Sequence, residues 1–168
     1  KPSTPNEKLL AKLASYDALA GIEAAYRLRS TTLHSPHMKR LFFRFFDRTQ
    51  RQLHYIEVVA RMEPALGADV ADRCEKVLQE RLQQLEADID RVTELAVAAL
   101  RANASSEEDP SFLAGGLTIP VRVISNISRQ LLRIIEKVDY YYGLLEGLRF
   151  DGAIPTRECD DRTGNLKL

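Results

Sequence analysis

The sequence lacks several features that would assign a function directly. It has no tryptophan and only two cysteines, Cys74 and Cys159, which lie far apart without a histidine at metal-ligand spacing. This pattern argues against a disulfide scaffold and fits a reducing compartment. No apolar run is long enough to span a membrane, and the N-terminus shows no signal-peptide pattern, so we expect a cytoplasmic protein that does not enter a membrane.

Enzyme signatures are missing as well. The sequence contains no phosphate-binding loop, no dinucleotide-binding glycines, no nucleophile elbow and no paired Glu-x-x-His motif. We therefore expect no catalysis, no cofactor and no small-molecule substrate. The 168 residues are enough for one domain with a real core, and we predict a single domain over residues 1–168.

Charge is balanced overall but unevenly distributed. The 24 basic and 24 acidic side chains cancel. Residues 27–61 nevertheless contain eight basic against two acidic side chains, a net charge of +6, and residues 69–109 contain five against eleven, a net charge of −6. Residues 117–149 carry +2. Two basic segments therefore flank an acidic one.

The clearest pattern lies between residues 116 and 148, where the hydrophobic period changes. Over 117–123 apolar residues alternate with other residues, which is the period of a strand with one buried face. After Ser125 and Asn126 the apolar residues lie three or four apart, as on one face of a helix that either residue can cap. The segment predicts a short strand that leads directly into a helix.

A similar order occurs ninety residues earlier. Placing Ser35 over Ser125 aligns a candidate strand at 27–35 and superposes Lys39 on Arg129, which suggests a degenerate repeat. Because a short strand needs a partner for its backbone groups, we expect these two strands to pair.

Apolar spacing predicts three further helical segments, which run from Asn6 to Tyr26, from Pro36 to Pro64 and from Asp69 to Asn103. The third carries a long apolar stripe that suits packing along another helix, with Cys74 as a small core residue. We expect a loose leader over 1–5, a surface loop over 104–116 and a tail over 157–168 whose order the pattern leaves undecided. The predicted fold is mainly α, a helical domain with a small antiparallel two-stranded ribbon.

A two-stranded antiparallel ribbon fits the major groove of DNA and can read base edges with one face. If the apolar face packs on the helices, the outward residues that would read bases are Thr118, Arg122, Ser30, Thr32 and His34. A register shifted by one residue would turn Arg27 and Arg29 outward instead, and we prefer the register that buries Leu33.

Helix N-termini that begin where the strands end would present free N–H groups to phosphates. The predicted phosphate contacts are therefore Ser35, Lys39, Asn126 and Arg129. The predicted partner is double-stranded promoter DNA, bound in a sequence-specific manner.

The segments LHSPHMKRLFFRF and IPVRVISNISRQLLRIIEKVDYYYGLLEGLRFDG, with a long acidic helix between them, resemble AcaB-type regulators of conjugative plasmids and integrative conjugative elements. The resemblance covers roughly residues 27–155. It implies a transcriptional activator of conjugative transfer genes that is related to the ribbon-helix-helix class, with the ribbon in the major groove. The usual unit of that class is shorter and pairs identical strands from two chains. The sequence therefore leaves open whether the ribbon forms within one chain or in a homodimer.

Plainer interpretations exist for each feature. Arg122 also fits the solvated face of an ordinary hairpin, and Tyr140, Tyr141 and Tyr142 fit packing or a subunit interface. His34 and His37 have no acidic or cysteine ligand at useful spacing, so we predict no metal site. The alternative function is a helical interaction module in which residues 69–103 bind a partner helix. Steep salt dependence would distinguish DNA binding from such a module.

Overall fold

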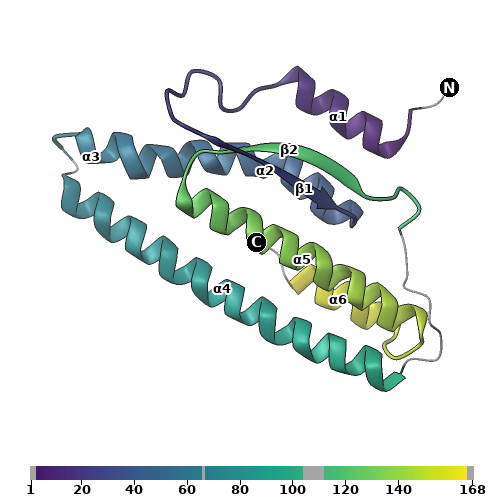
Figure 1. The fold of residues 1–168 in the computed structure, drawn as a ribbon. Helices are drawn as coiled ribbons and strands as arrows, with labels where there is room; N and C mark the ends of the chain where they lie inside the picture. Colours follow the sequence, from purple (N-terminus) through teal and green to yellow (C-terminus); the bar gives the residue numbers. More distant parts are fainter. Residues whose placement is uncertain (1–2, 66, 104–111, 166–168) are drawn as a thin grey trace.

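Two strands and the helices that follow them form the centre of the fold (Figure 1). The computed structural model describes residues 3–65, 67–103 and 112–165. In chain order the elements are α1 (Pro5–Ser15), β1 (Arg27–Leu33), α2 (Pro36–His54), the π-helical turn η1 (Tyr55–Val59), α3 (Ala60–Met62), α4 (Ala68–Asn103), β2 (Leu117–Val123), α5 (Asn126–Phe150) and α6 (Thr156–Asn165). The fold is mainly helical with a two-stranded antiparallel sheet, as predicted.

The strands confirm the ninety-residue repeat and pair within one chain. Ser30 lies opposite Pro120, and the same two residues are equivalent under the ninety-residue offset. The ribbon therefore has an internal pseudo-twofold axis between them. Each strand leads into a helix capped by an equivalent serine: the Ser35 hydroxyl accepts a hydrogen bond from the N–H of Met38, and the Ser125 hydroxyl accepts one from the N–H of Ser128.

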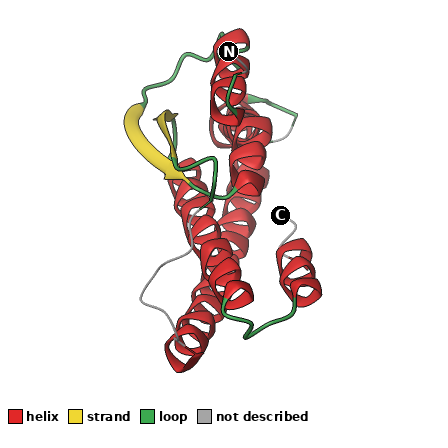
Figure 2. Cartoon of the chain, turned by 90° about the vertical axis from the view of Figure 1, so that its right-hand side faces the viewer, coloured by secondary structure: helices red, strands yellow, loops and turns green. Residues whose placement is uncertain are grey.

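The inner face of the ribbon packs on α2 and α5. Leu33, Ile119 and Val121 are buried, together with core side chains such as Phe46 and Ile135. The predicted register, with Leu33 inward, is thus confirmed. Figure 2 shows the ribbon at one side of the helices, where its outer face points away from them.

The long helix α4 runs along α5 in the same direction (Figure 1). Its apolar stripe faces this neighbour: Ile89 and Ala96 are buried, and Leu82, Leu85 and Val92 pack against the same core. Cys74, predicted in the core, is exposed instead, because it lies on the same side of α4 as Val70 and Val77, which are exposed as well. No helix in the described ranges is long and apolar enough to cross a membrane.

The chain ends differ from the prediction. Pro5 already belongs to α1, whose first turn is closed by a capping box between Thr4 and Glu7, so the leader is shorter than expected. The predicted helix to Tyr26 ends at Ser15, and residues 16–26 form a turn, with Gly21 at φ 78°, and a segment without regular secondary structure. The tail over 157–168 is helical to Asn165, and 166–168 lie outside the described residues. Most of the predicted loop, 104–111, also lies outside them.

Candidate nucleic-acid interface

The outward face of the ribbon is exposed along its whole length. Its residues, three from each strand, are Leu28, Ser30, Thr32, Thr118, Pro120 and Arg122. The Thr32 and Thr118 hydroxyls lie 2.9 Å apart across the strands. The outward placement predicted for Ser30, Thr32, Thr118 and Arg122 is thus observed, while the structure leaves their role in reading bases a prediction.

The free edge of β2 is closed by a buried side chain of α2. Gln50, fully buried, donates to the carbonyl of Arg122 at 2.9 Å and accepts from the N–H of Ile124 at 3.2 Å. These backbone groups therefore point away from β1. Pro120, two residues before Arg122, faces the same edge, where a missing N–H leaves no ladder bond unmade.

The first strand–helix junction is held from the other side. The carboxylate of Asp139 on α5, 4% exposed, accepts from the backbone N–H of His34 at 2.9 Å and of Ser35 at 2.8 Å. The His34 ring is exposed but lies 3.4 Å from the same carboxylate. His34 therefore lies just beyond the strand, with its exposed ring beside a carboxylate and, like the Thr32 side chain, next to Gly116. Its role in reading bases stays a prediction.

Two predicted phosphate contacts are corrected by burial. Ser35 is 3% exposed and its hydroxyl caps α2. Lys39 is 1% exposed, and its ammonium donates to the Asn6 side chain at 3.0 Å and to the carbonyl of Gly115. Burial lowers the pKa of Lys39 from its usual range. Neither side chain can reach a phosphate in this conformation, because Ser35 caps its own helix and Lys39 joins α2 to α1 and to the segment before β2.

The other two predicted phosphate contacts lie at the surface, at the N-terminus of α5. Asn126 and Arg129 are exposed and joined by a hydrogen bond of 2.8 Å. They line a cleft of about 640 Å³ together with Arg27 and Arg29 from the start of β1. We name these four residues the basic cleft.

The sequence-based prediction did not include Arg27 and Arg29 among the DNA contacts. Side chains alternate along a strand, so the register that buries Leu33 places both arginines on the inner face. In the structure, that end of β1 is exposed, so both side chains reach solvent despite their parity. Across the described part of the chain, neither forms an ion pair. The sequence feature that could have indicated these two residues is the Arg-Leu-Arg run, which places two positive charges at the start of β1.

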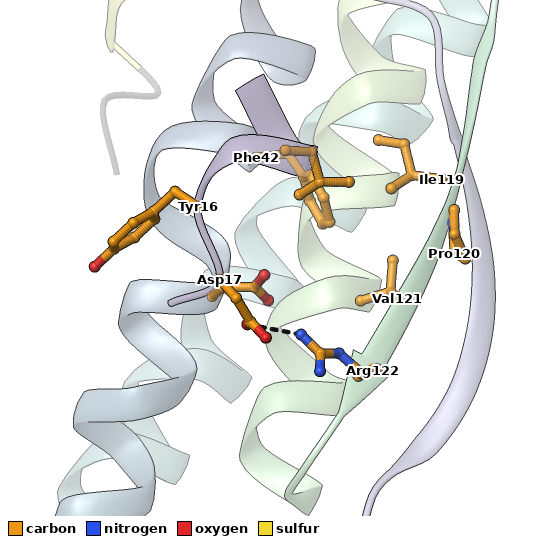
Figure 3. A pocket seen from close by; sticks show the side chains of 9 residues that line it. Tyr16, Asp17, Phe42, Ile119, Pro120, Val121 and Arg122 are labelled. Atoms are coloured by element: carbon orange, nitrogen blue, oxygen red, sulfur yellow. Dashed lines mark hydrogen bonds and ion pairs between the residues drawn. The ribbon is translucent and has the colours of Figure 1, made fainter. Parts of the chain in front are cut away.

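Arg122, by contrast, is paired. Its guanidinium donates to Asp17 at 2.8 Å, from the turn that follows α1 (Figure 3). The pair borders a pocket of about 220 Å³, also lined by Phe42, Asp47 and Ile119. The Arg122 hydrogen bond lowers the pKa of Asp17, while burial raises the pKa of Asp47.

No family model matches the sequence, and no curated protein matches it. A crystal structure of selenomethionine-containing AcaB from uropathogenic E. coli does match the fold, with a TM-score of 0.76 and 20% sequence identity. The match covers 85% of this chain and 72% of that chain. The chain has an AcaB-like fold.

Two of the four basic side chains of α5 form ion pairs with acidic side chains of α4. Arg133 and Lys137 both pair with Glu86 of α4, at 2.7 and 2.9 Å, and Lys137 also pairs with Asp90 at 2.8 Å. Hydrogen bonds from Arg133 and Lys137 lower the pKa of Glu86 to about 2. The acidic segment thus neutralises its basic neighbour, and the basic cleft lies apart from these pairs.

The histidines near the ribbon have separate partners in this AcaB-like fold. The His34 ring faces Asp139, and the His37 ring packs edge-on against Tyr142 at 5.7 Å between centroids. Within residues 3–65, 67–103 and 112–165, no group of three metal-ligating side chains comes together.

Proposed function

We propose that this protein binds double-stranded promoter DNA through the outward face of its β1–β2 ribbon and acts as a transcriptional regulator. The observation that carries the proposal is the uninterrupted exposure of that face, with hydroxyls and one guanidinium along it. A ribbon of two strands fits the major groove, which is about 12 Å wide in B-form DNA. Thr32, Thr118 and Arg122 are the side chains suited to hydrogen bonds with base edges.

The basic cleft supplies the second requirement of such a protein, contact with phosphates. Arg27, Arg29 and Arg129 lie at one end of the ribbon, next to the N-terminus of α5, whose dipole also favours anions. A ribbon in the groove would place this end near one phosphate strand. Neutralising phosphates releases counterions, so binding through the cleft should weaken as salt is added.

The sequence resemblance to AcaB-type regulators adds a biological setting, activation of conjugative transfer genes. The AcaB-like fold agrees with that resemblance at the level of architecture. The proposal requires no catalytic step and no cofactor. It also requires no second chain to complete the ribbon, because β1 and β2 pair within one chain.

The test is fluorescence anisotropy with duplexes tiled across the promoter of the protein's own operon, at two salt concentrations. Arg122→Ala should cost about 1 to 3 kcal/mol of discrimination for the preferred duplex if the guanidinium contacts a guanine. Arg91→Ala is the matched control, because Arg91 is an exposed arginine on α4, away from the ribbon. Absence of salt-sensitive binding by the folded wild-type protein would contradict the proposal.

The alternative function, a module that binds a partner helix through residues 69–103, has less surface available. The apolar stripe of α4 is largely occupied by α5 in the folded chain. A partner helix would have to use what remains exposed on α4, such as Val77 and Leu95, which are 55% and 63% exposed. Binding of a helical peptide without salt sensitivity would favour this alternative.

A further inference from the structure

One charged side chain belongs to the outward face of the ribbon, and the chain's own carboxylate already holds it. Arg122 donates to Asp17, a residue 105 positions earlier in the sequence, at 2.8 Å. Figure 3 shows the Asp17 side chain directed toward the guanidinium from the segment between α1 and β1. Any contact of Arg122 with DNA through the same N–H must replace this hydrogen bond.

The turn that carries Asp17 is fixed in place. Arg51 of α2 donates to the carbonyls of Ala18 and Ala20 at 3.2 and 3.4 Å, and Ala18 and Leu19 are 5% and 7% exposed. The N–H of Leu19 also donates to the Asp17 carboxylate at 3.0 Å. The carboxylate is therefore already oriented toward Arg122, and little side-chain ordering is needed to form the pair.

A second carboxylate strengthens the local negative field. Asp47 of α2 lines the same pocket and interacts electrostatically with both Asp17 and Arg122. A phosphate that approached Arg122 would meet repulsion from both acids, whereas a base edge carries no net charge. Non-specific DNA binding depends on phosphate contacts, so this arrangement penalises it more than binding to a preferred sequence.

We propose that Asp17 is a specificity-determining residue. Its ion pair with Arg122 opposes contact of the guanidinium with phosphates, and the pair is exchanged for a hydrogen bond between Arg122 and the edge of the correct base. The inference rests on the proposed function of the ribbon. Asp17 acts through Arg122, so it is a positioning residue and makes no contact with DNA itself.

The experiment measures the affinity of Asp17→Asn for the preferred duplex and for a scrambled duplex of equal length. The variant should bind the scrambled duplex roughly two- to fivefold more tightly, the range expected for loss of an exposed ion pair. Affinity for the preferred duplex should rise less, so the ratio between the two falls. Glu23→Gln is the matched control, because Glu23 is an exposed acid of the same segment and none of the ion pairs among described residues includes it.

A second measurement places the same change in an Arg122→Ala background. If Asp17 acts through Arg122, Asp17→Asn should then leave the affinity ratio unchanged. The inference would be overturned if Asp17→Asn still increased the affinity for the scrambled duplex in this background, or if Glu23→Gln increased it by a similar factor. Asp17 would then act only as a general negative surface charge. Lower affinity of Asp17→Asn for the preferred duplex would also overturn it, since Asp17 would then orient Arg122 for binding.

The two proposals fail in different ways. If the wild-type protein binds DNA selectively but Asp17→Asn keeps the wild-type ratio, the role of Asp17 is wrong and the ribbon proposal stands. If folded wild-type protein and all variants lack salt-sensitive binding to every duplex, both proposals are overturned. Thermal unfolding of each variant establishes that the comparison is made between folded proteins.

Discussion

The two strand–helix units, β1–α2 and β2–α5, share one plan but use equivalent positions differently. Their strands have the same length, their serine caps correspond, and their centres meet at Ser30 and Pro120. Yet Lys39 is buried, while its equivalent Arg129 is exposed. Internal repetition therefore fixes the backbone, and the surroundings of each unit decide whether a basic side chain serves the core or the surface.

The junctions between strand and helix show the same division. At equivalent positions, the N–H of His34 is bound by Asp139 of α5 and the N–H of Ile124 by Gln50 of α2. Each unit thus holds the junction of the other. One clamp is a carboxylate and the other an amide, so their loss should have unequal effects.

The largest expected effect is that of Asp139→Ala. The substitution leaves the backbone N–H groups of His34 and Ser35 without their acceptor and removes a negative charge that interacts favourably with buried Lys39. We expect the free energy of unfolding to fall by about 3 kcal/mol. Urea unfolding measures it, with the exposed Asp160→Asn as a control; a loss no greater than the control's would contradict the role of this clamp.

The comparison of Lys39 with Arg129 gives the next effect. Lys39→Ala should lower the free energy of unfolding by about 2 kcal/mol, because Asn6 and Gly115 lose a shared donor, and should leave the salt dependence of DNA binding unchanged. Arg129→Ala should leave stability within about 0.5 kcal/mol and reduce the salt slope by about 1. The distinction between a core role for Lys39 and a surface role for Arg129 would be refuted if Lys39→Ala changed the salt slope and Arg129→Ala lowered the free energy of unfolding.

Gln50→Ala tests the second clamp. The substitution removes no charged group, but it leaves the carbonyl of Arg122, the N–H of Ile124 and the Asp47 carboxylate without this partner. We expect a loss of about 1.5 kcal/mol in urea unfolding, half that of Asp139→Ala. Equal losses would show that charge is irrelevant to the difference between the clamps.

The smallest effect concerns the pairing of α4 with α5. The pKa of Glu86 is lowered to about 2, so its stabilising contribution is present above its usual value of 4.5 and is lost as the pH falls through about 2. Because Arg133 is half exposed, we expect Glu86→Gln to cost only about 1 kcal/mol at pH 7. The free energies of unfolding of wild type and variant, measured by urea unfolding, should converge as the pH falls from 4.5 to 2. A difference that stays constant over this range would exclude the ion pairs as its source.

Much of the fold could be predicted from local pattern. The change of period after residue 123 located β2 and α5, and the ninety-residue offset located β1 and α2. The burial of Lys39 could not be predicted, because its partners Asn6 and Gly115 lie 33 and 76 positions away. The same holds for Asp17 and Arg122, whose contact depends on where a non-helical turn crosses α2. Spacing along the chain carries no information on such pairs.

The pseudo-twofold axis between Ser30 and Pro120 relates two strands that are not identical. One presents Leu28, Ser30 and Thr32 and the other presents Thr118, Pro120 and Arg122. A ribbon made of two copies of one strand favours a palindrome and requires association before it can bind. In this protein both strands of the ribbon come from one chain. If the ribbon binds DNA as proposed, one chain presents two different strands to the groove, so we expect a non-palindromic site that the chain occupies in a single orientation.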